Sequence, residues 1–339
     1  MNSGNVKRFF ENFTGKESSE FNVLAQSGSS RVNFLAKNEN IKYIITYNEN
    51  IQENESFLYY SEIFSNLNLN TPKIFAISDN RKIYIQEFLG ANTLSEVIAR
   101  ENVSENVKYL VKQTLEKLYQ LQISTQGAID FSKTFEYEKY DELPVTHDLY
   151  YFKNFVADVL ELEYHKSTLL KEFKKIVNLI ENLEPKGLMI RDFQARNIMV
   201  NEKNEVSFID YQSAMEGPLM YDVISFLFQA KANFPEDFKN EMLEFYISQF
   251  DNEEARAQLR NSVKPIQMMR FLQVLGAYGF RGLIQRKQHF VASIEKGIEN
   301  IISFAQNWDQ MKEYPELEKV IGQLGLKKTR LKIEEILKH

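Results

Sequence analysis

The segment from residue 188 to residue 210 constrains the fold of this chain more than any other stretch. It reads LMIRDFQARNIMVNEKNEVSFID, which is an apolar run, a polar loop, a second apolar run, a turn and a third apolar run. Short apolar runs separated by turn residues predict strands. The loop contains Asp192 and Asn197, and the last predicted strand ends on Asp210. A carboxylate and an amide therefore lie in one loop between strands, and a second carboxylate follows at a strand end.

The loop has the Asp-to-Asn spacing of a kinase catalytic loop, in which the Asp accepts the proton of the attacking hydroxyl and the Asn binds Mg²⁺. Carboxylate and amide oxygens are ligands that Mg²⁺ prefers. We therefore predict phosphoryl transfer, with Asp192 as the catalytic base and Asn197 and Asp210 as the metal ligands. Arg196 is predicted to neutralise a phosphate or hold an acidic acceptor, and Arg191 to support the loop.

The composition of the chain argues against several other classes of protein. Its 339 residues contain no cysteine, which excludes disulfides, thiol nucleophiles and cysteine-ligated zinc. The formal net charge is −6 without a long basic run, so neither nucleic acid nor an anionic membrane is an expected partner. No apolar segment has the length of a signal peptide or a membrane span. We expect a cytoplasmic protein, with a monomer favoured.

Two kinds of periodicity divide the chain near Gly90. Before it, four short runs rich in β-branched and aromatic residues predict a small antiparallel sheet, and a helical run precedes the fourth, which gives the order β-β-β-α-β. After it, amphipathic helical runs dominate. The predicted strands are 21–26, 32–36, 42–47 and 82–87, and the predicted helices include 54–67, 107–121, 150–162, 169–183, 238–250, 266–284, 291–306 and 317–337. We predict an α+β chain with an N-terminal nucleotide-binding lobe, 1–90, and a helical lobe, 91–339, that carries the catalytic loop and the acceptor site.

Two segments of the first lobe are candidates for binding a nucleotide. No P-loop or dinucleotide-binding glycine motif occurs. The turn Ser27-Gly28-Ser29-Ser30 could cover phosphates, because small residues leave backbone N–H groups and hydroxyls accessible. Glu87 and Leu89, at the exit of the last predicted strand, could offer backbone groups to an adenine ring. By themselves these segments are better explained as an ordinary hairpin turn and a plain strand exit.

Polar residues near the catalytic loop are candidates for the acceptor site. Gln194, Gln212 and Glu216 are hypothetical contacts to a sugar or another hydroxyl compound. Asp222 lies in a predicted helix, one turn from apolar neighbours, where a carboxylate needs partners. We predict that Asp222 supports the catalytic loop structurally.

The motif around these residues resembles the aminoglycoside phosphotransferase and choline kinase superfamily, and within it the bacterial cell-wall amino-sugar kinases, which phosphorylate the anomeric hydroxyl of N-acetylmuramate and N-acetylglucosamine. The resemblance implies a two-lobed protein-kinase-like fold, ATP, Mg²⁺ and a small-molecule hydroxyl acceptor, here an amino sugar or a related sugar. The residues that carry it are Arg191-Asp192-Phe193-Gln194, Arg196-Asn197-Ile198-Met199, Ile209-Asp210-Tyr211-Gln212, Ala214, Gly217-Pro218 and Tyr221-Asp222.

The chain departs from this pattern at three positions. Thr46 lies on the third predicted strand, where members of the superfamily often have a lysine that pairs with the phosphates. Ile190 stands where a histidine is usual, and Ser213 where the amino-sugar kinases tend to have an aspartate. Two alternatives therefore stay open. The acceptor could be an aminoglycoside, choline or an amino alcohol, or the chain could bind a nucleotide without catalysis.

Overall fold

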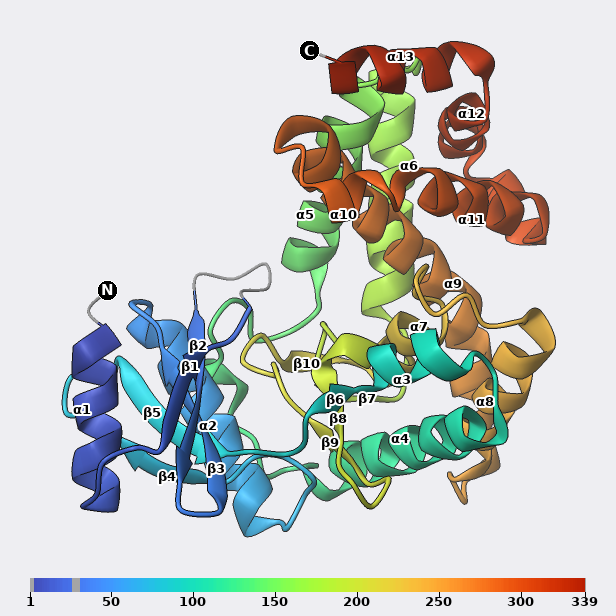
Figure 1. Cartoon of the computed structure of the whole chain (residues 1–339). Coiled ribbons are helices and arrows are strands. Elements are labelled where there is room, and N and C mark those ends of the chain that lie inside the picture. The colour runs from blue at the N-terminus through green and yellow to red at the C-terminus, as the bar shows by residue number, and fades with distance from the viewer. Residues whose placement is uncertain (1–2, 26–30, 339) are drawn as a thin grey trace. The chain divides into compact units, whose positions relative to one another are not determined.

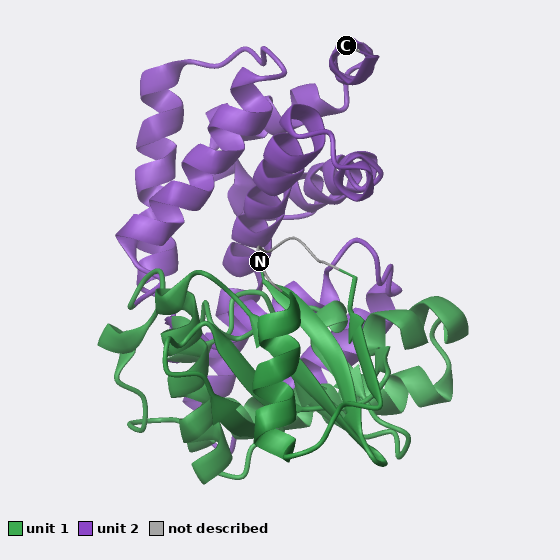
Figure 2. Ribbon diagram, turned by 60° about the vertical axis from the view of Figure 1, so that its left-hand side comes forward, with its two compact units in different colours: residues 1–138, 187–215 green, residues 139–186, 216–339 purple. Residues whose placement is uncertain are grey.

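The computed structural model of the chain describes residues 3–25 and 31–338 (Figure 1). It contains two compact units, coloured separately in Figure 2, and each is described by itself. Unit 1 comprises residues 1–138 and 187–215, and unit 2 comprises residues 139–186 and 216–339. The lobe boundary that we predicted near Gly90 is a different division of the chain, and it stays a prediction.

Unit 1 contains a five-stranded sheet in the order β1-β2-β3-β5-β4, in which all neighbouring strands are antiparallel. In the central register, Thr46 lies between Asn33 on one neighbouring strand and Tyr84 on the other. This confirms the predicted antiparallel sheet. The elements are α1 (Ser3–Thr14), β1 (Glu20–Val23), β2 (Val32–Asn38), β3 (Ile41–Tyr47), α2 (Ile51–Asn66), β4 (Ile74–Ile77) and β5 (Ile83–Glu87).

Strand β4 was missed by the sequence analysis. It has four residues, follows Pro72 closely and forms an edge of the sheet. Its register against β5 shifts between Ile74 and Ala76, and its residues Phe75 and Ile77 are 44% and 36% exposed. A short run that is apolar at every position lacks the two-residue alternation by which a half-buried strand is recognised in a sequence.

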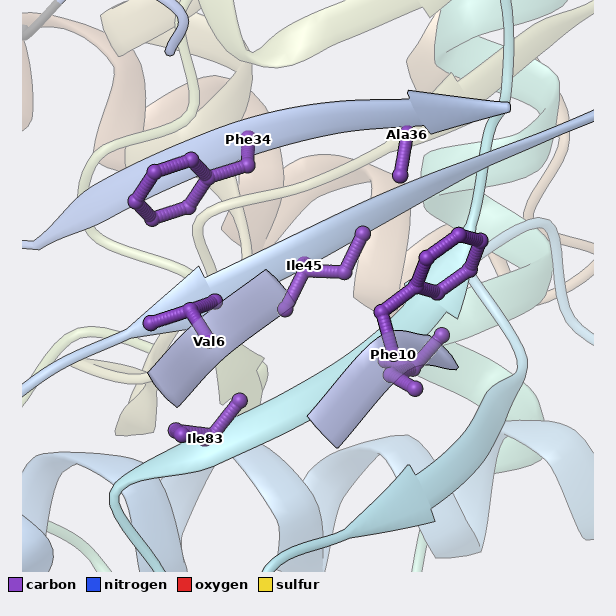
Figure 3. Packing of buried hydrophobic residues seen from close by; sticks show 7 residues of the cluster. Val6, Phe10, Phe34, Ala36, Ile45 and Ile83 are labelled. Atoms are coloured by element: carbon purple, nitrogen blue, oxygen red, sulfur yellow. The ribbon is translucent and has the colours of Figure 1, made fainter. Parts of the chain in front are cut away.

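One face of the sheet is covered by α1, and we call it the α1 face. Strand side chains alternate between faces, so every second residue of β2, β3 and β5 points toward this helix. Figure 3 shows these side chains packed around Phe10, which is fully buried. The cluster consists of Val6, Phe10, Phe34, Ala36, Ile45, Ile83 and Ile85.

The opposite face of the sheet contacts α2, and we call it the α2 face. Phe57 of α2 stacks on Tyr84 with ring centroids 5.2 Å apart and on Tyr211 at 4.8 Å. The Ser61 hydroxyl lies 2.7 Å from the Tyr211 hydroxyl. Helix α2 therefore packs both on the sheet and on the segment that follows Asp210.

The remainder of unit 1 contains a small second sheet in the order β6-β8-β9 and two helices. The α3 helix starts with a capping box between Thr93 and Glu96, and the Ser104 side chain caps α4. The helix predicted at 107–121 is part of α4. The elements are β6 (Asn92–Thr93), α3 (Leu94–Glu101), α4 (Glu105–Ser124), η1 (Phe131–Lys133), η3 (Ala195–Asn197), β8 (Ile198–Val200) and β9 (Val206–Phe208), with most of β7 (Lys186–Met189).

Unit 2 is built around the long helix α9, which packs against α5, α7 and α11. We predicted a helix over 266–284, which begins just after Pro265. It starts instead after the Asn252 cap and continues through the buried Pro265. The elements are α5 (Glu142–Phe152), η2 (Lys153–Asp158), α6 (Lys166–Glu181), most of β10 (Met215–Pro218), α7 (Met220–Leu227), α8 (Glu236–Ser248), α9 (Glu253–Tyr278), η4 (Gly279–Ile284), α10 (Gln288–Val291), α11 (Ile294–Gln306), η5 (Asp309–Glu313), α12 (Pro315–Leu324) and α13 (Lys327–Lys338).

The end of unit 2 corrects a further prediction. The segment 317–337 forms two helices, α12 and α13, rather than one, and the break falls at Gly325. Over the residues that the structure describes, no helix combines the length and the apolar character needed to cross a membrane.

Candidate active site

The predicted catalytic loop is a tight turn held by its own backbone. The Asp192 N–H donates to the Ile190 carbonyl at 2.9 Å, and the Asn197 N–H donates to the Gln194 carbonyl at 2.8 Å. Arg191 has a φ of +71°, which is uncommon for a residue with a side chain and is found mostly where the surroundings hold it in place. The loop leads through η3 directly into β8, so its conformation is fixed at both ends by short regular structure.

Asn197 connects the loop to the end of β9. Its Nδ2 donates to the Asp192 carbonyl at 2.9 Å and to Asp210 Oδ2 at 3.2 Å. The Ile209 N–H donates to the Asn197 carbonyl at 3.0 Å. The structure thus brings the three predicted groups Asp192, Asn197 and Asp210 together, although Asp210 is thirteen residues beyond Asn197 in the chain.

The carboxylate of Asp192 is held by two neighbours and remains accessible. Gln194 Nε2 donates to Oδ1 at 2.6 Å, and Arg196 Nη2 donates to Oδ2 at 2.9 Å. The side chains of Asp192 and Arg196 are 38% and 47% exposed. An acceptor hydroxyl can therefore reach this carboxylate from solvent, and Arg196 places a positive charge next to it.

Asn197 and Asp210 have the chemistry of a partial Mg²⁺ site. Mg²⁺ is commonly held by one or two protein oxygen ligands together with phosphate oxygens and waters. Two side chains in direct contact can contribute to one such coordination shell. In residues 3–25 and 31–338, no group of three or more His, Cys, Asp or Glu side chains is arranged as a metal site, so the remaining ligands would have to come from phosphate and water.

A cation that the sequence analysis did not identify lies beside Asp210. Arg31, immediately before β2, forms an ion pair and hydrogen bond with Asp210 Oδ1. Its Nε lies 3.3 Å from Glu53 Oε1, and its Nη1 donates to Gln212 Oε1 at 3.1 Å. The side chains of Arg31 and Glu53 are each 12% exposed. Burial acts to lower the pKa of Arg31, but the charges of Asp210, Tyr84 and Glu53 outweigh it and raise the pKa. Arg31 is therefore a fixed cation.

The position on β3 where a lysine was expected belongs to a neutral polar cluster. The Thr46 hydroxyl donates to Asn33 Oδ1 at 2.7 Å and accepts from Gln86 Nε2 at 2.9 Å. Burial raises the pKa of Tyr84 to about 12, and Arg31 and Thr46, which both interact with its hydroxyl, oppose that rise. Thr46 pairs with Tyr84 on one neighbouring strand and bonds to Asn33 on the other, so this polar cluster lies on the α2 face of the sheet.

Gln212, which we predicted to contact the acceptor, contacts Asp210 and Arg31 in the structure. It is 7% exposed, its Nε2 lies 3.4 Å from Asp210 Oδ1, and its carbonyl accepts from the Ser56 hydroxyl at 2.7 Å. These contacts give it a role in holding Arg31 and Asp210. Contact with an acceptor stays a prediction for Gln212. It also stays a prediction for Gln194, whose amide donates to the Asp192 carboxylate.

The predicted supporting residues lie in different units. In unit 1, Arg191 lies 3.9 Å from Glu136 and its guanidinium lies over the Tyr137 ring at 5.8 Å. In unit 2, Asp222 is fully buried in α7, and Glu216 pairs with Lys139 at 3.1 Å. The roles proposed for Glu216 at the acceptor and for Asp222 in supporting the loop stay predictions.

The predicted nucleotide contacts are described only in part. The turn Ser27-Gly28-Ser29-Ser30 lies outside the described residues. Glu87 ends β5, and its N–H donates to the Lys73 carbonyl at 2.9 Å within the sheet. Leu89 follows outside any strand and is half-buried. Next to it, Gly90 has a φ of +136°, and a Cβ there would lie 2.5 Å from the Val200 carbonyl oxygen, so this exit requires glycine.

Arg31 and Glu53 are the site residues that sequence reasoning missed. A signal existed for both. The absence of a lysine on the third strand required a cation from elsewhere, and Arg31 is the first basic residue after the predicted phosphate-covering turn. Glu53 lies in the first turn of α2, after the Asn50 cap. Neither residue has a characteristic spacing to the catalytic loop, because they are far from it in the chain.

Comparison with known proteins agrees with this geometry. The sequence profile of the phosphotransferase enzyme family matches residues 23–260. Two curated relatives carry the name N-acetylmuramate/N-acetylglucosamine kinase. One, from Pseudomonas aeruginosa, is 25% identical over 185 residues, which are 53% of this chain and 51% of the relative. The other, from Neisseria meningitidis, is 26% identical over 176 residues, 50% and 49% of the two chains. The match thus spans about half the length of each.

Solved structures show that the fold is that of the same superfamily. A choline kinase from Streptococcus pneumoniae superposes with a TM-score of 0.60 at 13% identity, covering 89% of this chain and 99% of that one. A spectinomycin phosphotransferase bound to AMP gives 0.65 at 13% identity, with 91% and 99% coverage. An aminoglycoside phosphotransferase bound to ADP and hygromycin B gives 0.59 at 15% identity, with 88% and 98% coverage. The protein-kinase-like fold predicted from the motif is confirmed.

Proposed function

Because the chain belongs to the phosphotransferase enzyme family, we propose that it transfers the γ-phosphate of ATP to a hydroxyl group of a small molecule in the presence of Mg²⁺. The observation that carries the proposal is the contact between Asn197 and Asp210, with Asp192 bonded to the same asparagine. Asn197 bonds the backbone carbonyl of Asp192 and the carboxylate of Asp210, so one side chain ties the residue that carries the proton acceptor to the second metal ligand. Phosphoryl transfer depends mainly on such positioning.

The residues of the loop divide the chemistry between them. Asp192 orients the acceptor hydroxyl and takes its proton as the oxygen bonds to the γ-phosphorus and the bond to the ADP oxygen breaks. Arg196, paired with Asp192 at 2.9 Å, keeps that carboxylate in place and neutralises charge nearby. Asn197 and Asp210 would hold Mg²⁺, which would supply positive charge to neutralise the phosphates.

For the acceptor, we propose an amino sugar or a related sugar. The two curated relatives named as N-acetylmuramate/N-acetylglucosamine kinases support this choice. So does Arg196, because a half-exposed guanidinium beside the base suits a neutral or acidic sugar and repels a quaternary ammonium group. Choline, amino alcohols and aminoglycosides are therefore the second choice, although relatives in fold act on such compounds.

An ADP-release screen over N-acetylmuramate, N-acetylglucosamine, aminoglycosides, choline and amino alcohols tests both proposals. Asp192→Asn should lower turnover by a factor of about 100 or more and leave ATP binding intact, since it removes the base and not the metal ligands. Asp79→Asn, in an exposed turn of unit 1, is the matched control. Wild-type protein that binds Mg²⁺-ATP but turns over none of these acceptors would favour a nucleotide-binding module instead.

A further inference from the structure

The α2 face of unit 1 contains a buried guanidinium between two carboxylates, and the proposed chemistry does not yet use it. Arg31 contacts Asp210 with one end of its fork and Glu53 with the Nε side. Buried ion pairs of this kind are often no more stabilising than apolar residues of equal volume. Stability alone therefore gives no reason for this arrangement.

Arg31 lies at the carboxylate that would hold Mg²⁺. Mg²⁺ is usually bound by one or two carboxylates together with substrate phosphates, so phosphates would be expected close to Asp210. Arg31 contacts that same carboxylate. The planar guanidinium fork matches a phosphate as well as it matches a carboxylate, which makes Arg31 a candidate to contact phosphates there.

Glu53 holds Arg31 from a helix that is itself tied to the metal site. The Ser56 hydroxyl donates to the Gln212 carbonyl at 2.7 Å, and the Tyr60 hydroxyl donates to the Ala214 carbonyl at 2.8 Å. Because these carbonyls follow Asp210 closely in the chain, the hydrogen bonds fix α2 to the segment that contains the predicted metal ligand. In protein kinases, a Lys on the third strand and a Glu on a helix form the corresponding pair. Here the strand position is Thr46.

We propose that Arg31 binds the phosphates of the nucleotide in place of a third-strand lysine, and that Glu53 is the residue that positions it. This inference rests on the proposed kinase function. In this chain the cation lies at the start of β2 instead of on β3. The Arg31 side chain is long enough to reach Asp210 and Glu53 from there. Thr46 could remain neutral because the charge is supplied from the neighbouring strand.

The test is calorimetric binding of Mg²⁺-ATP, Mg²⁺-ADP and adenosine to the full chain. Arg31→Met should weaken ATP and ADP binding roughly 10- to 100-fold, the usual size of a lost charge-assisted hydrogen bond, and leave adenosine binding unchanged. Arg31→Lys should keep part of the affinity. Arg81→Met, which removes an exposed guanidinium paired with Glu55, should bind all three ligands as the wild type does.

A second pair of variants tests whether the lysine position and Arg31 are equivalent. Thr46 pairs with Asn33 across the sheet and bonds to it, and Asn33 lies two residues after Arg31, so a lysine at position 46 would extend on the same face of the sheet as Arg31. Adding Thr46→Lys to Arg31→Met should recover at least part of the lost ATP affinity. Arg31→Met leaves the Glu53 carboxylate without its partner, which could prevent folding. In that case the double variant Arg31→Met with Glu53→Gln removes the carboxylate charge. ATP and adenosine binding are then compared in the double variant in the same way.

The outcomes distinguish the phosphate-binding role of Arg31 from the proposed kinase function on which it rests. Equal weakening of ATP and adenosine would mean that Arg31 only maintains the fold of unit 1, and would overturn the phosphate role. Unchanged ATP affinity in a folded Arg31→Met protein would overturn it as well. Wild-type protein that binds no nucleotide at all would refute the proposed kinase function first. Selective loss for the phosphorylated ligands, with recovery by Thr46→Lys, would support the assignment.

Discussion

The two faces of the five-stranded sheet in unit 1 differ in what their side chains are used for. On the α1 face, every member of the buried cluster is apolar, and Phe10, Phe34 and Ile45 are fully buried. On the α2 face, the neighbouring positions Asn33 and Thr46 are polar and hydrogen-bonded to each other. Alternation along a strand lets adjacent residues serve different purposes. One face stabilises the sheet, and the other supports the charges at the candidate active site.

The largest effect is expected on the α1 face. Phe10→Ala should lower the free energy of unfolding by about 3–5 kcal/mol, because it removes a fully buried ring from a close-packed cluster. Nucleotide affinity of the folded fraction should not change. Denaturant titration and calorimetry measure the two quantities. Phe13→Ala, on the same helix but 40% exposed, is the control and should cost about 1 kcal/mol. A large affinity change in Phe10→Ala would show that the faces are not independent.

A smaller effect, on nucleotide binding rather than on the free energy of unfolding, is expected for Asp210→Asn. It removes the charge that pairs with Arg31 and that would hold Mg²⁺. Groups that only support metal ligands typically contribute 10- to 100-fold in metal affinity, about 1.4–2.7 kcal/mol, so a ligand itself should contribute at least this much to Mg²⁺-dependent ATP binding. Titration of ATP binding with Mg²⁺ gives the answer, with Asp79→Asn as the control. An unchanged titration would contradict the metal role.

Adjacent residues on β3 give the sharpest comparison. Ile45→Val removes one methylene from the α1 face and should lower the free energy of unfolding by about 0.5–1.5 kcal/mol. Thr46→Val keeps the shape but removes the buried hydroxyl that bonds Asn33 and Gln86, and should cost about 1–3 kcal/mol because these partly buried groups lose their shared partner. Thermal unfolding of both variants measures the difference. Equal costs would mean that the polar cluster contributes no more than ordinary packing.

Most of the helices and four of the five strands of the first sheet were predictable, because their apolar period is local. The strand β4 was not, since four consecutive apolar residues carry no period. The predicted start of α9, at residue 266, was too late. A proline usually interrupts a helix, but α9 runs through Pro265 and packs on α5 and α7. Local rules failed where contacts from distant segments were stronger than local preference.

The sequence by itself determined the chemical groups of the catalytic loop, because Asp192 and Asn197 lie in one turn and Asp210 follows on the next hairpin. Short chain segments leave little freedom in how such residues can meet. Only the tertiary structure decided which cation faces Asp210. Arg31 and Glu53 come from segments more than a hundred residues away, and their meeting depends on how β2 and α2 pack on the sheet. A charge can be supplied from any neighbouring strand that reaches the site, so its origin could not be predicted from spacing along the chain.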